Sequence, residues 1–211
     1  MSTRASRTSG WLSVVVGTLD LECAAVLGEQ RAGGDPTAAW RAACERDLAR
    51  QHGVGVVPSS VAATFVLQWY VGALATGFAH LTLATPHLLD LTPSRLSIGL
   101  SSPGGYADRL GLVPGEAPAY VPLLADRLDR VEREFRSHAS DFATSYDPGV
   151  KMSSQHRVGS VEDAWQSAWA GASRAVLGRT SPDRWRASCC FIYALPGAHE
   201  CARCPRLRSA G

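Results

Sequence analysis

Four of the six cysteines in this 211-residue chain lie close together near its C-terminal end. Cys189 and Cys190 are adjacent, ten residues follow, and Cys201 and Cys204 then form a C-x-x-C pair. Clustered thiolates bind metals, as in a structural zinc site or an iron–sulfur cluster. The spacing therefore predicts a metal centre at this end of the chain.

The adjacent cysteine pair helps to distinguish a zinc site from an iron–sulfur cluster. Structural zinc sites usually combine two C-x-x-C turns, and here one of the two is replaced by the bare Cys189-Cys190 pair. Neighbouring side chains in an extended segment point in opposite directions, so the pair converges poorly on one ion. A [2Fe–2S] cluster accepts a wider separation because each of its irons takes two thiolates. The residues favour this cluster, and a zinc site with four cysteine ligands stays open as the alternative.

The spacer between the two cysteine pairs predicts how they meet. Phe191-Ile-Tyr-Ala-Leu195 favours a strand, and Pro196-Gly197 is a turn signal. A hairpin-like return would bring the C-x-x-C pair back towards the adjacent pair. We therefore expect a C-terminal cluster-binding segment over 181–211 with a hairpin-like course.

The N-terminal region bears on the redox compartment. Arg4 and Arg7 precede an apolar run that resembles a secretory signal, but Asp20 and Glu22 interrupt the run and no small-residue cleavage site follows. We therefore expect a cytoplasmic protein. In a reducing compartment, cysteines are more often metal ligands or catalytic groups than disulfides.

Composition and length describe a globular chain of one domain. The hydrophobic fraction is 45% and the charged fraction 19%, and the formal net charge of +2 predicts no nucleic-acid surface. We expect a disordered tail over 1–10, a helical body over 11–180 and the cysteine-bearing segment over 181–211. Cys23 and Cys44 have no cysteine or histidine at metal-ligand spacing, so we expect both to be buried in the body.

The sequence of the body predicts a fold that is mainly α with a small β component (α+β). Asp35-Pro36 is a helix-start signal, and Ser160-Val-Glu-Asp163 resembles a capping box with Asp in place of the usual Glu. Helices are expected over 35–53, 61–84, 119–138 and 160–177, with a strand over 94–100 and a strand turning into a helix over 11–27.

The stretch 61–84 is the most apolar part of the chain, and its length approaches that of a membrane span. No strongly charged flank bounds it, and five polar residues interrupt it: Thr64, Gln68, Thr76, His80 and Thr82. We therefore expect a central buried helix. Peripheral contact with the inner membrane stays open.

The cysteine pattern resembles the C-terminal motif of the FhuF-like ferric siderophore reductases. The shared features are Cys-Cys-x10-Cys-x-x-Cys, Leu-Pro-Gly in the spacer and Pro205 after the last cysteine. The helix expected before the cysteines is also similar to the small-residue helix of that family. The resemblance implies that Cys189, Cys190, Cys201 and Cys204 bind a [2Fe–2S] cluster.

The resemblance also implies an activity and its partners. The family reduces siderophore-bound Fe(III) by one electron, and iron is released because the siderophore holds Fe(II) far more weakly. The chain shows no Gly-rich flavin or nicotinamide fingerprint, so an external donor protein or a reduced flavin or nicotinamide system must supply the electron. Two other interpretations stay open: a zinc-stabilised interaction module, and a siderophore-binding or biosynthetic relative whose cluster is structural or redox-sensing.

Arginines surround the cysteine motif. A cluster of two ferric ions, two sulfides and four thiolates carries a net charge of about −2, which reduction makes more negative. Nearby cations could offset this charge, raise the reduction potential or dock an anionic donor or chelate, or they could simply keep the tail soluble. The residues concerned are Arg184, Arg186, Arg203, Arg206 and Arg208.

Overall fold

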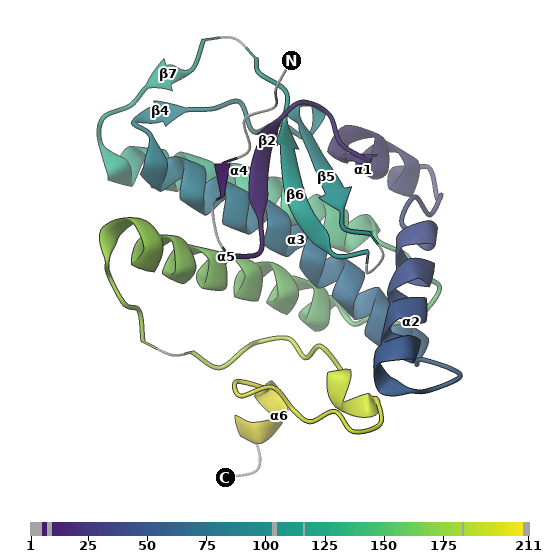
Figure 1. Ribbon diagram of the computed structural model, residues 1–211. Helices are drawn as coiled ribbons and strands as arrows, with labels where there is room; N and C mark the ends of the chain where they lie inside the picture. The colour runs from purple at the N-terminus through teal and green to yellow at the C-terminus, as the bar shows by residue number, and fades with distance from the viewer. Residues whose placement is uncertain (1–5, 8–9, 103–104, 116, 183, 209–211) are drawn as a thin grey trace.

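The computed structural model describes residues 6–7, 10–102, 105–115, 117–182 and 184–208. The protein is mainly helical with a small β component, which confirms the expected fold class. Three long helices pack together, a small sheet covers one side of them, and the cysteine-bearing segment lies below α5 (Figure 1). The helices are α1 (Cys23–Arg31), α2 (Ala38–His52), α3 (Ser59–Ala84), α4 (Leu124–Ser145), α5 (Ser154–Leu177) and α6 (Pro205–Arg208).

The main sheet has the strand order β1-β2-β6-β5-β3. Neighbouring strands run antiparallel except β2 and β6, which pair in parallel. A separate two-stranded sheet pairs β4 with β7. The strands are β1 (Ser6–Arg7), β2 (Ser13–Val16), β3 (Leu21–Glu22), β4 (His87–Leu88), β5 (Leu96–Leu100), β6 (Ala107–Leu112) and β7 (Ala119–Tyr120).

Helix α3 is the centre of the core, as the sequence predicted. It is apolar on nearly all sides, so it is stable only where other elements surround it, and it contacts α2, α4, α5 and β6. Gly77 allows the sheet to approach, since a Cβ atom there would lie 2.2 Å from Leu110 Cδ2 on β6. By length and composition α3 could cross a membrane, but 78% of its most apolar window is buried inside the protein. Cys23 and Cys44 are also buried, as expected.

Three helix starts differ from the prediction. The helix expected to begin at Asp35-Pro36 begins at Ala38, and its N-cap is Thr37. The Asp35 carboxylate does not cap the helix because it accepts from the Thr37 and Arg41 side chains. The helix expected over 119–138 begins at Leu124 and continues to Ser145, because Ala119–Tyr120 pair with β4 and Pro122 restricts the residue before it to extended backbone. The helix expected over 160–177 begins at Ser154. Its N-cap is Ser153, whose Oγ accepts a hydrogen bond from the His156 backbone N–H at 3.2 Å.

The capping-box prediction at Ser160 is therefore wrong, because this residue lies inside α5. Strand β6 was not predicted. The disordered tail expected over 1–10 falls mostly outside the described residues, but Ser6–Arg7 form β1 against β2, so the prediction is wrong for this pair. Helix α2 ends at Gly53, as predicted, in a left-handed conformation with φ 63°.

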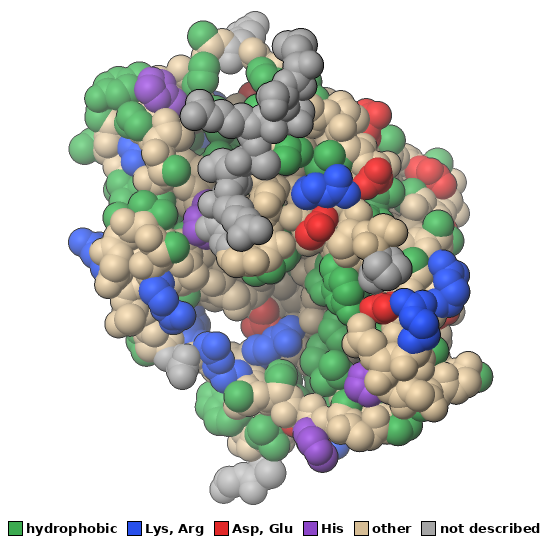
Figure 2. All heavy atoms as spheres, in the orientation of Figure 1, with side chains coloured by type: hydrophobic (Ala, Val, Ile, Leu, Met, Phe, Trp, Pro, Cys, Tyr) green, Lys and Arg blue, Asp and Glu red, His purple; other side chains and the backbone are tan. Residues whose placement is uncertain are grey.

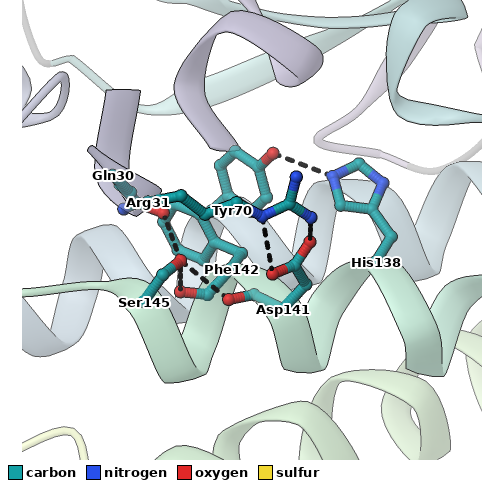
Figure 3. Close-up of polar contacts among 7 residues, drawn as sticks. All are labelled: Gln30, Arg31, Tyr70, His138, Asp141, Phe142 and Ser145. Carbon is teal, nitrogen blue, oxygen red and sulfur yellow. Dashed lines mark hydrogen bonds and ion pairs between the residues drawn. The ribbon is translucent and has the colours of Figure 1, made fainter. Parts of the chain in front are cut away.

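A buried polar contact joins α3 to α4 beside the end of α1 (Figure 3). Tyr70 Oη lies 2.9 Å from His138 Nε2, and the Tyr70 ring stacks on Phe142 with ring centroids 3.6 Å apart. His138 is 4% exposed, and its Nδ1 has no hydrogen-bond partner among the described residues. Burial lowers the pKa of His138 to about 4, so the imidazole is neutral in the folded protein at pH 7.

This buried histidine predicts a loss of stability in mild acid. An unfolded chain protonates His138 near pH 6.5, whereas the folded protein resists protonation down to about pH 4. Stability therefore falls as the pH drops through this interval, by up to about 3 kcal/mol from this residue alone. The expected result is that His138→Gln shows a smaller difference in unfolding free energy between pH 7 and pH 5 than the parent.

Urea unfolding followed by far-UV circular dichroism at both pH values measures this difference. His87→Gln is the matched control because His87 is exposed, and this variant should keep the parental pH dependence. An unchanged pH dependence in His138→Gln would contradict the assignment.

Candidate metal centre

The cysteine segment, residues 184–208, runs back under α5 and then folds on itself (Figure 1). Helix α5 ends at Gly178, which is left-handed with φ 65°, as the sequence predicted. Further along, the Arg186 backbone N–H donates to the Arg203 carbonyl at 3.1 Å. This bond joins the stretch before the first cysteine pair to the stretch between the last two cysteines.

Asp163 on α5 anchors the residues immediately before Cys189. Its Oδ1 accepts from the Ala187 N–H at 2.8 Å, and its Oδ2 accepts from the Ser188 N–H at 2.9 Å and from Ser188 Oγ at 2.6 Å. Arg186 Nε lies 3.6 Å from the same Oδ2. The Asp163 side chain is only 13% exposed, so these bonds form largely away from water.

Gly159, one turn before Asp163, lets the cysteine segment come close to α5. A Cβ atom at this position would lie 3.1 Å from the carbonyl carbon of Ala187. Gln68 of α3 adds a longer contact, with its Nε2 3.4 Å from Ser188 Oγ. Helices α3 and α5 together thus fix the start of the cysteine pair.

The structure brings the first and last cysteines together. Cys189 Sγ and Cys204 Sγ are 3.9 Å apart. Two thiolates bonded at about 2.3 Å to one tetrahedral metal lie roughly 3.8 Å from each other. This pair therefore has the spacing of two ligands of one metal ion.

Cys190 and Cys201 lie in the same neighbourhood, at greater sulfur separations. Cys190 and Cys204 are buried, whereas Cys189 and Cys201 are half-buried. In the part of the chain that the structure describes, Cys189–Cys204 is the one sulfur–sulfur contact, and no group of three or more metal-binding side chains surrounds a single point. The four sulfurs therefore do not all surround a single point, as the ligands of one zinc ion would.

The surroundings of Cys189 and Cys201 disfavour the thiolate form of both side chains. The pKa of Cys189 is raised to about 11, chiefly by burial. The Phe191 backbone N–H acts against this rise, and the nearby Cys204 and Cys190 thiols add to it. Burial also raises the pKa of Cys201, with Cys190 and Cys204 adding in the same direction and Arg186 acting against them. Thiolates in this site are therefore disfavoured unless metal ions neutralise them.

The return between the two cysteine pairs is not the predicted hairpin. Residues Ile192–Ala194 form a 3₁₀ helix, and no strand pairing occurs among the described residues of the segment. The chain reverses because Phe191 is left-handed (φ 58°) and a turn follows at Pro196-Gly197. Such a conformation is unfavourable for a residue with a side chain, so surrounding contacts must impose it.

Phe191 supplies those contacts. Its ring stacks on His156 of α5 at a centroid distance of 5.3 Å and packs against a second hydrophobic cluster that includes Leu48, Val61 and Leu195. Its backbone N–H points to Cys189 Sγ at 3.4 Å. Donors to ligand sulfurs raise the potential of iron–sulfur clusters, so this N–H would favour the reduced state.

Four of the five arginines of the segment have two different surroundings, and the fifth, Arg208, is exposed at the end of α6. Arg206 is held inside the segment: it contacts Glu200 at 3.6 Å, donates to Tyr193 Oη at 2.8 Å and covers the Tyr193 ring at 4.0 Å. Arg184, Arg186 and Arg203 instead line a hollow beside α5. Arg206 therefore stabilises the turn, whereas the three arginines of the hollow face a space where another molecule could lie.

The donor set fits a [2Fe–2S] cluster. Four cysteines are available, two of their sulfurs have the spacing expected at one iron, and a backbone N–H points to one of those sulfurs. The sequence identified these four residues by their spacing. It did not identify Asp163, because the capping-box interpretation gave this carboxylate a local role.

Comparison with known families agrees with the cysteine segment. Residues 186–206 match the family model described as the FhuF 2Fe-2S C-terminal domain. This range contains all four clustered cysteines and leaves the helical body outside the match. No curated protein matches the chain.

Proposed function

We propose that this chain, whose residues 186–206 match the FhuF 2Fe-2S C-terminal domain, is a [2Fe–2S] ferric-siderophore reductase. It would transfer one electron to chelated Fe(III) and so release Fe(II) for iron acquisition in the cytoplasm. The observation that carries the proposal is the Cys-Cys-x10-Cys-x-x-Cys motif within that domain, with the outer two sulfurs 3.9 Å apart.

In this proposal Cys189, Cys190, Cys201 and Cys204 hold the cluster. When bound, the cluster supplies a one-electron couple. Buried Cys190 and Cys204 would form the inner side of the site, and half-buried Cys189 and Cys201 the outer side. Electron donor and acceptor can therefore come close to the site from the surface without opening the fold.

Residues around the cysteines would hold the site in place and adjust its charge. Asp163 fixes the chain before the first pair, and the Phe191 backbone N–H contacts a ligand sulfur. Arg186 places a guanidinium close to Cys201, where it opposes the rise in that thiol's pKa. Both the N–H and the guanidinium favour added negative charge, as one-electron reduction requires.

The electron would come from outside the chain. A donor protein or a reduced flavin or nicotinamide system is the class we propose, because the sequence has no Gly-rich fingerprint for such a cofactor. We propose contact with the inner membrane only as a peripheral arrangement on its cytoplasmic face, since α3 is mostly enclosed by other elements.

Anaerobic purification tests the cofactor. We expect a reddish protein with about two irons and two acid-labile sulfides per chain. A colourless protein with one zinc per chain would overturn the proposal and support a zinc-stabilised interaction module.

Stopped-flow mixing tests the reaction itself. Protein reduced with dithionite should be reoxidised by ferric siderophores on the timescale of turnover. A protein that holds its cluster but is not reoxidised would reject the reductase assignment. A structural or redox-sensing cluster in a siderophore-binding or biosynthetic relative would then be the better interpretation.

A further inference from the structure

The hollow beside α5 has a volume of about 450 Å³. Helices α3 and α5 form two of its walls, and residues 184–187 with Arg203 form a third. Figure 2 shows a hollow on this face with Lys and Arg side chains gathered along its lower rim. The volume is in the range of pockets that bind small organic molecules.

The wall that α3 contributes is polar, although the helix is apolar elsewhere. Gln68, Gly72, Thr76 and His80 are spaced four residues apart, so they lie in one row along the helix. A row that only packed against α5 would be expected to be apolar. An ideal Cβ at Gly72 would meet no atom within 4 Å, so open space faces this position.

Ser160 on the α5 side gives independent evidence for a ligand. Its side chain is 1% exposed and lines the hollow, and its Oγ has no hydrogen-bond partner among the described residues. Buried polar groups of this kind in native proteins are usually explained by a water, an ion or a ligand. The hydroxyl is therefore available to a molecule that enters the hollow.

Three tryptophans line the same hollow: Trp11, Trp169 and Trp185. Trp169 stacks on the buried ring of Trp165 with centroids 6.4 Å apart, so its orientation is already fixed. Trp11 and Trp185 are 49% and 48% exposed, which is unusual for such large side chains. Aromatic rings around a hollow are suited to stack on a planar ring of a ligand.

The two carboxylates of the hollow are already paired with arginines. Glu162 lies 2.8 Å from Arg136. Asp163 Oδ2 lies 3.6 Å from Arg186 Nε and also accepts hydrogen bonds from Ser188. Because these ion pairs are made within the protein, recognition of a ligand falls mainly to the hydrogen-bonding and aromatic groups of the walls.

The position of the hollow points to the electron donor. Residues 184–187 of its third wall lead directly to the first cysteine pair, and Arg203 adjoins Cys204. The cluster accepts one electron at a time. A reduced nicotinamide gives up a hydride, which carries two electrons, whereas a reduced flavin can give up its electrons singly. Among small organic donors, a flavin therefore matches a one-electron centre.

We propose that the hollow binds the tricyclic ring of a dissociable reduced flavin, which is the electron donor to the cluster. This inference rests on the proposed reductase function. The planar ring would stack on the tryptophans, and its edge of carbonyl and N–H groups would bind Gln68, Thr76 and Ser160. A flavin held by its ring needs no Gly-rich phosphate loop, which the sequence lacks.

The electrons and protons of this step balance. A reduced flavin loses two electrons, one at a time, and releases two protons to water. Each electron passes by way of the cluster to one chelated Fe(III), which becomes Fe(II). One reduced flavin therefore supports the reduction of two ferric ions and leaves the hollow as oxidised flavin.

Binding of oxidised riboflavin tests this inference separately from electron transfer. Calorimetry on the cluster-loaded protein should show one saturable site per chain, for which NADH does not compete. Gly72→Leu fills the hollow from a helix position with open space, so it should weaken riboflavin binding at least tenfold. Ser160→Ala should weaken it severalfold and leave the unfolding temperature unchanged, because this hydroxyl has no partner among the described residues.

The matched control comes from a position outside the hollow. Gly28→Leu places the same side chain on exposed α1, where a Cβ also meets no atom within 4 Å, and it should bind riboflavin as the parent does. Absence of saturable binding by the parent, or unchanged binding by Gly72→Leu, would overturn the inference. Displacement of riboflavin by a gallium(III) siderophore would also overturn it, because the hollow would then hold the chelate and not the donor.

These outcomes are independent of the reductase assignment. Oxidised riboflavin supplies no electron, so a protein that binds it but is not reoxidised by ferric siderophores would fail the proposed function alone. Reoxidation by ferric siderophores without riboflavin binding would leave the reductase in place and refute the flavin donor.

Discussion

Cys190→Ser is expected to lose the cluster. Anaerobically purified variant should contain less than a tenth of the iron and sulfide of the parent and lack its visible absorption. Cys190 is buried next to Cys189, and a serine hydroxyl is a hard, weakly acidic ligand that does not replace a thiolate at iron. The effect should be close to complete because each iron takes two protein thiolates.

The control for this experiment is a cysteine outside the segment. Cys23 is buried in the main core, and Cys23→Ala should keep the full iron and sulfide content. Far-UV circular dichroism should show that both variants retain the helical body, which lies outside the C-terminal domain. A Cys190→Ser protein with parental iron content and an unchanged paramagnetic resonance spectrum after reduction would refute the ligand assignment.

The elements that the sequence predicted well are those specified by local signals. Helix α3 follows from a long apolar run, and α2 ends where Gly53 supplies a left-handed cap. The candidate ligands follow from cysteine spacing in the same way. None of these depends on residues far away in the chain.

The elements that were missed depend on distant partners. Strand β6 pairs with β2, which lies more than ninety residues earlier in the sequence, and its own six residues show no clear alternation. Phe191 was expected in a strand because its aromatic side chain favours one. Its stacking on His156 of α5 imposes a left-handed conformation instead.

The hollow was visible in part in the sequence. Gln68, Thr76 and His80 were used only as evidence against a membrane span, although their four-residue spacing, with Gly72 between them, also predicts a polar row on one face of the helix. What that row faces cannot be inferred from α3 alone, because the opposing wall comes from α5 and from the segment that precedes the cysteines.

Asp163→Ala is expected to release the cluster at least tenfold faster than the parent on exposure to an iron chelator. The carboxylate accepts from both backbone N–H groups that precede Cys189 and from Ser188 Oγ. Hydrogen bonds to a charged group contribute about 1.5–3 kcal/mol each, and Ser188 is almost fully buried, so the donors left behind find little water. A loss of about 1.4 kcal/mol at the site already corresponds to a factor of ten.

Asp163→Asn distinguishes the effect of the side chain's shape on cluster loss from the effect of its charge. The amide keeps one oxygen acceptor, so the rate of cluster loss should fall between those of the parent and the alanine variant. Glu162→Gln is the matched control: this carboxylate precedes Asp163 on α5 but pairs with Arg136 and Gln166, and the variant should release the cluster at the parental rate.

The reduction potential distinguishes a positioning role from a purely structural one. Removing the negative charge of Asp163 also leaves Arg186 uncompensated beside the cysteines, and both changes favour the reduced cluster. Asp163→Asn should therefore have a higher potential than the parent, whereas Glu162→Gln, whose carboxylate is directed to Arg136, should change it less. If Asp163→Asn and Asp163→Ala lowered only the unfolding temperature and left both the potential and the rate of cluster loss unchanged, Asp163 would be a residue of the fold and not of the metal centre.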